Sequence, residues 1–243
     1  LVFTGAYMDF GDWLRNENGT LAYTSLANTF GFQTIEDEQF WNIFSHKQYI
    51  LFQSLNRLVI YNQQSNTLKT YTSEYGILDA FVNDDEIYFQ DNNRTLFKIE
   101  NEKSLVYLSA AALNQNQVVG LVNTSVGQLI VTRENGLFLN ARNLKATQPQ
   151  LSKSLAQDVV YSFTQAANGQ LILGTVKNGV YILSESGALV HHINVDSGLN
   201  NDTVLSVFSD NRGVWLGLDD GLAYVKLEAA IQQYNSRQEA IGT

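Results

Sequence analysis

One pattern of short apolar strands and polar turns recurs along this 243-residue chain and limits the folds available to it. Its clearest copy, GLNNDTVLSVFSDNRGVWLGLDDGLAYV (198–225), contains three apolar runs separated by an Asp-Asn-Arg-Gly turn and an Asp-Asp-Gly turn. Asp-Gly between alternating apolar segments is a strong hairpin signal, because glycine accepts the positive φ of a tight turn. The stretch is therefore predicted to form a three-stranded antiparallel meander.

Earlier stretches repeat this order of strands and turns. Residues 158–183 and 117–139 are clear copies, and 77–99 and 40–61 are weaker ones. Equivalent second-strand positions lie 37, 42, 42 and 43 residues apart, at Ile50, Ile87, Leu129, Leu171 and Val214. A period near 40 with three or four short strands per unit is typical of β-propeller blades.

We therefore predict an all-β chain, a β-propeller of four-stranded antiparallel blades with about six blade units represented. Residues 1–243 are interpreted as one propeller region, truncated at both ends and cut from a larger propeller. Leu1–Gly5 is interpreted as the second strand of a blade that lacks its innermost strand. The predicted units are 1–30, 37–72, 75–112, 115–155, 156–197 and 198–235.

Two segments of the later units are less regular. The only proline, Pro149, is placed in the outer-strand region of the fourth unit, where an edge strand tolerates a missing N–H. The sixth unit is expected to take 231–234 as its outer strand, with a helical turn over 228–233 as the alternative. Residues 241–243 are interpreted as the start of another blade.

Composition excludes several classes of function. Only 16% of the residues are charged and the net charge is −9, so a nucleic-acid partner is not expected, because phosphate binding needs clustered Lys and Arg. The chain has no cysteine, which removes disulfides, thiolate metal sites and cysteine nucleophiles. No apolar run approaches the roughly 20 residues that cross a bilayer.

The repeat separates scaffold residues from candidate site residues. Trp215 shares its register with apolar residues of the other units, so it is expected to be buried between sheets and not to bind a ligand. Gly174 and Gly217 share one repeat position, which favours a close approach of sheets over a phosphate loop. The residues assigned to the register of Trp215 are Ile172, Ile130, Tyr88, Leu51 and Phe3.

The segment 198–222 closely resembles the repeat of the two-component regulator propeller family. The matching residues are Gly198, Leu199, Asn201, Val204, Val207, Asp210, Gly213, Trp215, Leu216, Gly217, Gly221 and Leu222. TGAYMDFGDWLRNENGTLAYTSL (4–26) is similar to a segment in the propellers of periplasmic sensor regulators from Bacteroidetes-type bacteria, and YNSRQEAIGT (234–243) is similar to their blade lead-in. In those regulators the propeller precedes a Tyr-rich domain, a membrane helix and a cytoplasmic histidine kinase or helix-turn-helix output.

No motif for catalysis or metal binding stands out. The adjacent His191 and His192 point to opposite faces of a strand and cannot chelate one metal. The Asp-rich turns 84–86 and 219–220 could meet calcium, but aspartate is common in turns for its backbone hydrogen bonds. We therefore expect no catalytic residues, no metal site and no cofactor.

Geometry places a candidate ligand site better than any motif does. In a propeller, the turns between the second and third strands and the connections between blades lie on one face around the axis. Here they are rich in groups that hydrogen-bond or stack on sugars and peptides, although turns are polar in any case. The predicted ligand-binding residues are Tyr7, Asp9, Arg57, Tyr75, Asn92, Arg94, Arg133, Glu134, Lys177, Asn178, Asn201 and Asp219.

The resemblance implies a non-enzymatic, periplasmic ligand-sensing or interaction module of a bacterial signal-transduction regulator. Its expected partners are a small molecule or an oligosaccharide, and further blades and output domains of the same parent chain; a homodimer stays open. Two alternatives remain. A propeller-type lyase or hydrolase would gather ionisable residues with perturbed pKa values at the channel mouth. A structural component of a cell-surface or secretion assembly would carry a flat apolar patch at its rim.

Overall fold

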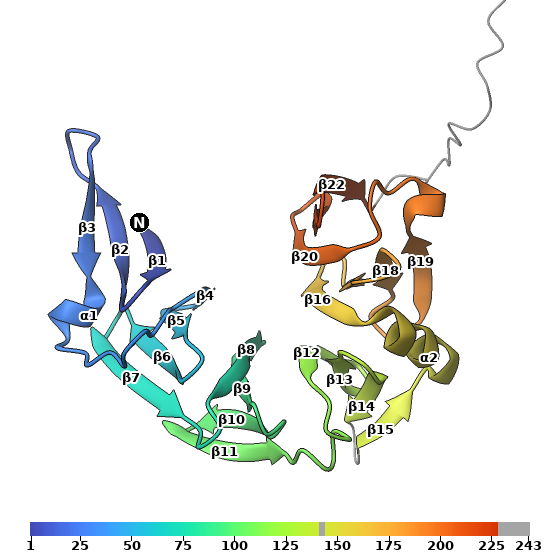
Figure 1. The fold of residues 1–243 in the computed structure, drawn as a ribbon, viewed down its shortest axis with the longest axis horizontal. Coiled ribbons are helices and arrows are strands. Elements are labelled where there is room, and N and C mark those ends of the chain that lie inside the picture. The colour runs from blue at the N-terminus through green and yellow to red at the C-terminus, as the bar shows by residue number, and fades with distance from the viewer. Residues whose placement is uncertain (141–143, 228–243) are drawn as a thin grey trace, which may run out of the picture. The chain divides into compact units, whose positions relative to one another are not determined.

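A computed structural model describes residues 1–140 and 144–227 of the chain. They form six antiparallel sheets of three or four strands, each hydrogen-bonded in the order of the sequence (Figure 1). The chain divides into two compact units, an N-terminal unit, Leu1–Gln115, and a C-terminal unit that begins at Asn116. Within the described residues, no helix has the length and apolarity of a membrane span. The successive four-stranded meanders confirm the predicted all-β, propeller-blade architecture.

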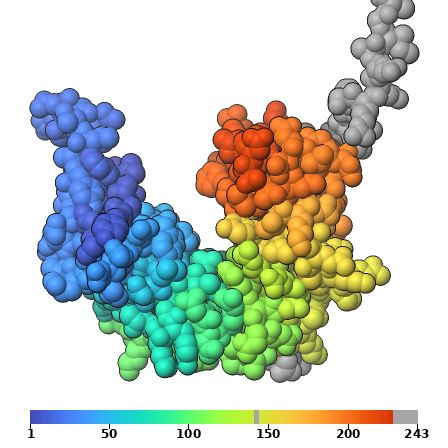
Figure 2. Space-filling model, viewed as in Figure 1, coloured from blue at the N-terminus to red at the C-terminus, as the bar shows by residue number. Residues whose placement is uncertain are grey.

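Three sheets make up the N-terminal unit. Figure 2 shows the tip of the β2–β3 hairpin, in blue, standing clear of the rest of this unit. The elements are β1 (Val2–Ala6), β2 (Asp9–Arg15), β3 (Leu21–Ser25) and the short helix α1 (Leu26–Thr29); then β4 (Asn42–His46), β5 (Tyr49–Gln53), β6 (Arg57–Asn62) and β7 (Thr67–Thr72); then β8 (Ile77–Asn83), β9 (Glu86–Asp91), β10 (Leu96–Glu100) and β11 (Lys103–Leu108).

The C-terminal unit also contains three sheets. Its last sheet has three described strands. The outer strand predicted at 231–234, the alternative helical turn at 228–233 and the blade start predicted at 241–243 lie outside the described residues. The elements are β12 (Val118–Thr124), β13 (Gly127–Thr132), β14 (Gly136–Asn140) and β15 (Leu144–Thr147); helix α2 (Pro149–Asp158); β16 (Val160–Gln165), β17 (Leu171–Thr175), β18 (Val180–Leu183) and β19 (Leu189–Ile193); a 3₁₀ turn (Val195–Ser197); then β20 (Val204–Ser209), β21 (Gly213–Leu218) and β22 (Gly221–Lys226).

Helix α2 corrects the placement of Pro149. The outer strand β15 ends at Thr147, and Pro149 begins the helix rather than lying in the outer-strand region. Proline suits the first turn of a helix, because its missing N–H would have no intrahelical partner there and its φ is already helical. Leu155 of this helix is fully buried and packs with β13, β14 and β17.

The middle sheet of each unit buries apolar side chains on both of its faces. On β5, Ile50 and Phe52 pack toward the first sheet, whereas Leu51 packs toward β8–β11. On β17, Leu171 packs toward β12–β15 and Ile172 packs toward β20–β22. Alternate side chains of a strand point to opposite faces, so one central strand serves two sheet–sheet contacts.

Backbone hydrogen bonds link each sheet to the next one within its unit. They join the turn between the second and third strands of one sheet to the residues that lead into the following sheet. Because the β1–β2 turn makes this bond, β1 lies at the position that second strands take in the other sheets. The absence of an innermost strand from the first blade stays a prediction. The bonds are Phe40 N to Ala6 O, Ile77 N to Leu55 O, Val160 N to Arg133 O and Gly179 N to Asp202 O, at 2.7–3.1 Å.

A β-bulge recurs in four innermost strands and fixes the register of the repeat. Val131 and Gly217 are the residues that pair directly after the bulge in their sheets, and Leu129 and Trp215 each lie two residues before them. Leu129, not Ile130, is therefore the equivalent of Trp215, and the predicted register of the fourth unit was wrong by one residue. The bulged residues are Leu78, Val119, Tyr161 and Leu205, and the pairs that follow them are Asp79–Gln90, Gly120–Val131, Ser162–Gly174 and Ser206–Gly217.

Trp215 is 45% exposed, so the prediction that it is buried between sheets was wrong. Its neighbours on β21, Val214 and Leu216, pack toward β16–β19, and Trp215 therefore points to the opposite face of its sheet. Within the described residues no sheet covers that face. The indole contacts Tyr224 at 4.7 Å between ring centroids and donates from Nε1 to Asp210 at 3.2 Å.

A buried ion pair holds the connection between the first two sheets. The Glu38 side chain is fully buried and accepts hydrogen bonds from Arg57 Nε (2.9 Å), Ser54 Oγ (2.7 Å) and the Ile35 N–H (3.1 Å). The Arg57 guanidinium also covers the ring of Phe32 at 4.4 Å. Burial alone would raise the pKa of Glu38, but the hydrogen bonds from Arg57, Ser54 and Ile35 outweigh it and lower the pKa.

Replacing Arg57 by Met should destabilise the N-terminal unit, because Glu38 would be left as a buried, unpaired charge. We expect a loss of about 3 kcal/mol in the free energy of unfolding, measured by urea denaturation. The stabilisation that Glu38 gains from its lowered pKa should be present above pH 4.5 and be lost as the pH falls through the folded-state value. Lys69→Met, which removes an exposed ion pair, is the control; equal losses for the two variants would contradict this role of Glu38.

Truncating Trp215 and truncating its register equivalent Ile172 should lower the free energy of unfolding by different amounts. Ile172 is fully buried, so Ile172→Ala is expected to cost about 2–5 kcal/mol. Trp215→Ala in this chain removes mainly the contact with Tyr224 and should cost about 1 kcal/mol. Chemical denaturation of both variants followed by circular dichroism tests this order, and a larger loss for Trp215→Ala would refute it.

Candidate functional site

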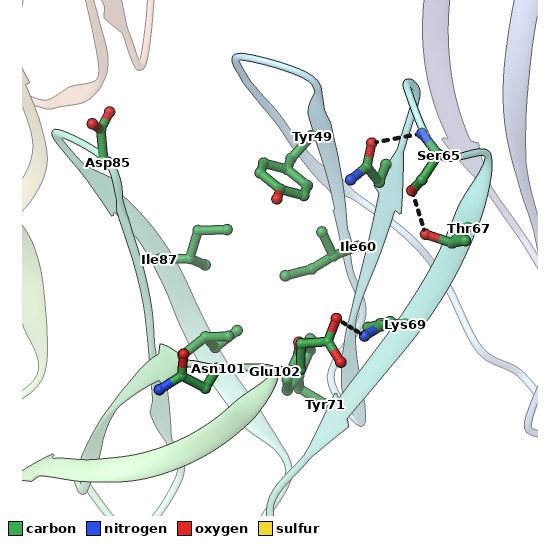
Figure 3. A pocket seen from close by; sticks show the side chains of 12 residues that line it. Tyr49, Ile60, Ser65, Thr67, Lys69, Tyr71, Asp85, Ile87, Asn101 and Glu102 are labelled. Carbon is green, nitrogen blue, oxygen red and sulfur yellow. Dashed lines mark hydrogen bonds and ion pairs between the residues drawn. The ribbon is translucent and has the colours of Figure 1, made fainter.

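A cleft opens between the sheets β4–β7 and β8–β11 of the N-terminal unit (Figure 3). Its volume is about 360 Å³, within the range of small-molecule sites. Its lining comes from β5, β6 and β7 on one side and from β9, the end of β10 and the adjoining turns on the other. The lining residues are Tyr49, Ile60, Asn62, Ser65, Thr67, Lys69, Tyr71, Asp85, Ile87, Ile99, Asn101 and Glu102.

The inner wall of the cleft is apolar because the core between the two sheets opens here toward solvent. Ile60 and Tyr71 belong to that core, and Ile87 and Ile99 pack against it. Figure 3 shows the Tyr49 ring next to Ile60, with Ile87 on the facing strand. These groups offer a ligand an aromatic and aliphatic surface.

Two ion pairs cross the mouth of the cleft. Lys69 of β7 pairs with Glu102 of the β10–β11 turn, and Lys47 of the β4–β5 turn pairs with Asp85 of the β8–β9 turn. The hydrogen bond and positive charge of Lys47 lower the pKa of the Asp85 carboxyl. All four side chains are substantially exposed, so solvent screens both pairs and little energy holds the sheets together at the mouth.

Several polar groups of the cleft have no partner within the part of the chain that the structure describes. The hydroxyls of Tyr49 and Tyr71 and the side-chain amide of Asn101 make no hydrogen bond there. Burial, followed by the negative charge of Glu102, raises the pKa of Tyr71, so its hydroxyl stays protonated at neutral pH. The wall therefore presents neutral donors and acceptors beside an apolar surface.

The cleft continues into a groove along the outer strands β7 and β11. Lys69, Tyr71 and Glu102 line both hollows, and the groove adds Thr70, Thr72 and residues 103–105. The Lys69–Glu102 ion pair lies where the two meet. The shape suits an extended ligand with one end in the cleft.

The residues predicted from sequence lie elsewhere, and none of the twelve lines this cleft. Those of the N-terminal unit lie mainly at the second-to-third strand turns and the connections, at the other end of the sheets. There they serve the fold: Arg57 binds Glu38, Asn92 Nδ2 donates to Tyr75 O at 2.8 Å, and Tyr7 OH donates to Asp37 at 2.6 Å. Asp9 accepts from Ser25 Oγ at 2.6 Å and from Tyr23 OH at 3.0 Å, and Arg94 takes a positive φ in its turn.

The C-terminal unit carries the other six predicted residues. Arg133 lies over the Tyr161 ring at 4.9 Å, Asn178 donates to Asp158 at 3.0 Å, and Asn201 accepts from the Thr203 N–H at 2.7 Å. Glu134, Lys177 and Asp219 are exposed. These residues remain a predicted ligand face, but half of them also stabilise local structure.

Among the candidate metal and histidine positions, His192 and Asp85 have structural partners. His192 lies on β19, stacks on Tyr181 at 4.1 Å between centroids, and contacts Asn178 O through Nε2 at 2.7 Å, whereas His191 is exposed. In the Asp-rich turn after β8, Asp85 pairs with Lys47. Among the described residues, no group of three His, Asp or Glu side chains is placed to hold a metal ion.

Comparison with known proteins identifies the fold. No protein-family model matches the sequence, and no curated protein matches it. Among solved structures, the extracellular domain of the putative one-component system BT4673 from B. thetaiotaomicron is 18% identical, with a TM-score of 0.53 over 91% of this chain. PorZ, described as an essential bacterial surface component of the type-IX secretion system of Porphyromonas gingivalis, is 14% identical, with a TM-score of 0.60 over 93% of this chain.

A third similar structure, the WD40 β-propeller domain of Doa1, is 14% identical, with a TM-score of 0.61 over 91% of this chain and 75% of that one. At these identities the likeness concerns the fold, and the fold is that of a β-propeller. The chain spans 39% of the BT4673 domain and 38% of PorZ.

The ion pairs at the mouth should contribute little to stability, since they are exposed. A double-mutant cycle with Lys69→Ala and Glu102→Ala is expected to give a coupling energy below about 1 kcal/mol in urea unfolding. The coupling should fall further when salt is raised from 0.05 to about 0.5 M. A salt-independent coupling of several kcal/mol would mean that this pair holds the two sheets together.

Proposed function

We propose that this chain is part of an extracytoplasmic, ligand-sensing propeller of a bacterial signalling protein, located in the periplasm, and that the cleft between β4–β7 and β8–β11 is its ligand site. The fold likeness to extracellular domains of putative one-component and hybrid two-component systems supports this class of protein. The observation that carries the site is the cleft itself, which combines an apolar Tyr and Ile wall with unpartnered neutral polar groups.

The proposed ligand is an oligosaccharide or a similarly hydroxyl-rich small molecule. Sugar rings offer apolar C–H faces that pack on aromatic side chains such as Tyr49, and their hydroxyls pair with neutral donors and acceptors such as Asn101. The charged side chains at the mouth already neutralise one another as Lys69–Glu102 and Lys47–Asp85. Such a lining favours a neutral ligand over a strongly charged one.

We infer that the chain binds this ligand without catalysis. General acid–base catalysis needs an acid and a base within about 3 Å of the reacting atom, with pKa values tuned to the reaction. In the cleft, Glu102 and Asp85 are paired with lysines, and the pKa of Asp85 is lowered. A sensor signals because the bound ligand shifts a conformational equilibrium of the protein. Turnover would consume the ligand and so reverse that shift. Further blades and an output domain of the parent protein are its proposed intramolecular partners.

One comparison favours a second candidate function, a structural part of a cell-surface or secretion assembly. PorZ, a bacterial surface component of a secretion system, shares the fold at a TM-score of 0.60. In that case the groove along β7 and β11, with exposed Leu105 and Val106 on the outermost strand, would contact protein instead of a small molecule.

Removing single polar groups from the cleft should weaken ligand binding and leave the fold intact. Ligands are first found by a thermal-shift and glycan-array screen, with product assays run in parallel. For a hit, Tyr49→Phe and Asn101→Ala should each raise Kd about 3- to 10-fold in calorimetry, the cost of one hydrogen bond. Unfolding midpoints should stay within about 2 °C of the parent chain.

Matched variants separate the two candidate faces. Tyr75→Phe and Glu134→Ala, at the turn face predicted from sequence, should leave Kd unchanged. If these variants weaken binding and the cleft variants do not, the ligand lies on the turn face and the cleft assignment is wrong. Turnover of a hit would overturn the non-catalytic assignment.

A further inference from the structure

Helix α2 lies beside the outer strand β19 of the C-terminal unit (Figure 1), and the two elements border a hollow in the surface, the α2–β19 hollow. Its volume is about 520 Å³, within the range of small-molecule sites. Among the described residues, no Asp, Glu, Lys or Arg side chain lines it. The lining residues are Gln148, Pro149, Gln150, Leu151 and Ser154 on one side and Tyr181, Leu189 and His192 on the other.

The contacts of His192 leave one part of its imidazole open. The ring stacks on Tyr181 at 4.1 Å between centroids and 17° between planes, so one ring face is covered. Its Nε2 lies 2.7 Å from the backbone oxygen of Asn178, so that edge is also occupied. The opposite ring face and Nδ1 remain. Nδ1 has no partner in the part of the chain that the structure describes.

The contact with Asn178 decides which nitrogen of His192 carries the proton. A carbonyl oxygen only accepts hydrogen bonds, so Nε2 is the donor. In the neutral imidazole, Nδ1 then holds a lone pair and can accept a hydrogen bond. Asn178 is itself fixed, because its Nδ2 donates to Asp158 and its Oδ1 accepts from Asn194, both at 3.0 Å. Strand β19 therefore presents an acceptor in a fixed orientation.

Tyr181 supports the imidazole and has no hydroxyl proton to spare for a ligand. Its hydroxyl donates to Asp158, the last residue of α2, at 2.5 Å. Burial, followed by this hydrogen bond, raises the pKa of Tyr181, so the hydroxyl stays protonated. The same bond ties β18 to the end of α2. Both sides of the α2–β19 hollow are thus held by the fold before any ligand binds.

Apolar side chains complete the α2–β19 hollow. Leu189 is 50% exposed, although it pairs across the strands with the fully buried Leu183. Leu183 and Tyr181 leave β18 on the same face, so Leu189 shares that face with His192. Pro149 and its neighbours in the first turn of α2 add apolar surface from the other side. The hollow therefore combines an apolar surface with one directed acceptor.

We propose that the α2–β19 hollow is a second ligand site, which takes a neutral ring compound carrying a hydroxyl or N–H group. That group donates to His192 Nδ1, and the ring packs on Leu189 and Pro149. The ligand is neutral because no charged side chain of the described chain lines the hollow to compensate the desolvation of an ion. The site lies within the C-terminal unit and is independent of the cleft between β4–β7 and β8–β11.

Phenol and anisole are matched probes for this site, because they share one ring and only phenol donates a hydrogen bond. Each is titrated into the ¹⁵N-labelled 243-residue chain and followed by NMR, in which the imidazole nitrogens of its three histidines report their protonation. We expect the proton of His192 on Nε2 and a shift of its Nδ1 signal on addition of phenol. The Kd of phenol should be about 3- to 10-fold lower than that of anisole, the effect of one hydrogen bond.

Three variants make the outcome specific. His192→Phe keeps a ring over Tyr181 but removes Nδ1, so the two probes should bind equally. Leu189→Ser should weaken both probes alike. His191→Phe, on the opposite face of β19, should change neither Kd.

Measurements on the unsubstituted chain decide the proposal even if His192→Phe does not fold. A proton on Nδ1 of His192, phenol binding that leaves the Nδ1 signal in place, or equal Kd values for phenol and anisole would each overturn it.

Discussion

Packing of sheet against sheet, on both faces of the middle sheet of each unit, is the constraint on which this structure depends. A four-stranded sheet whose middle strands read Ile-Leu-Phe or Leu-Ile-Leu cannot leave either face in water, because alternate residues of the strand point to opposite sides. The second strands β5 and β17 therefore each serve two cores. Stability is shared between neighbours, as in other repeat proteins, and a sheet at the end of a series keeps one apolar face open.

The rim cleft of the N-terminal unit follows from the same packing. The innermost strand β8 lies against β5 and β6 of the preceding sheet, and buried apolar side chains fill the core between the two sheets there. At the end of the sheets that carries the β6–β7 and β10–β11 turns this packing stops, and Tyr49 and Ile87, near the starts of β5 and β9, line the cleft. Exposed ion pairs then bridge the gap where apolar packing has ended, so the space between them remains open to a ligand.

Polar residues of the turns between second and third strands contribute to the contacts between neighbouring sheets. Backbone bonds such as Ile77 N to Leu55 O join each turn to the next sheet, and the buried Glu38–Arg57 pair strengthens one of these junctions. Asn178 and Asn92 likewise donate to neighbouring connections. A turn rich in Asn, Asp and Arg can therefore either hold neighbouring sheets together or bind a ligand. Its composition alone does not distinguish these two roles.

The sequence by itself determined the fold class, the strand order and most strand boundaries. Turn residues and the alternation of apolar and polar residues are local properties, and they recur in each unit of about 40 residues. It also predicted that β1 is a second strand. Tertiary structure decided what depends on neighbours: that Leu129 rather than Ile130 shares the register of Trp215, that Pro149 begins a helix, and that Trp215 is open to solvent. The cleft was not predicted, since Tyr49, Ile60 and Ile87 read as ordinary strand residues and become a site only where the packing between two sheets stops. A periodic pattern specifies which side chains leave a sheet on each face, but the distance between two sheets is set by packing over residues far apart in the chain.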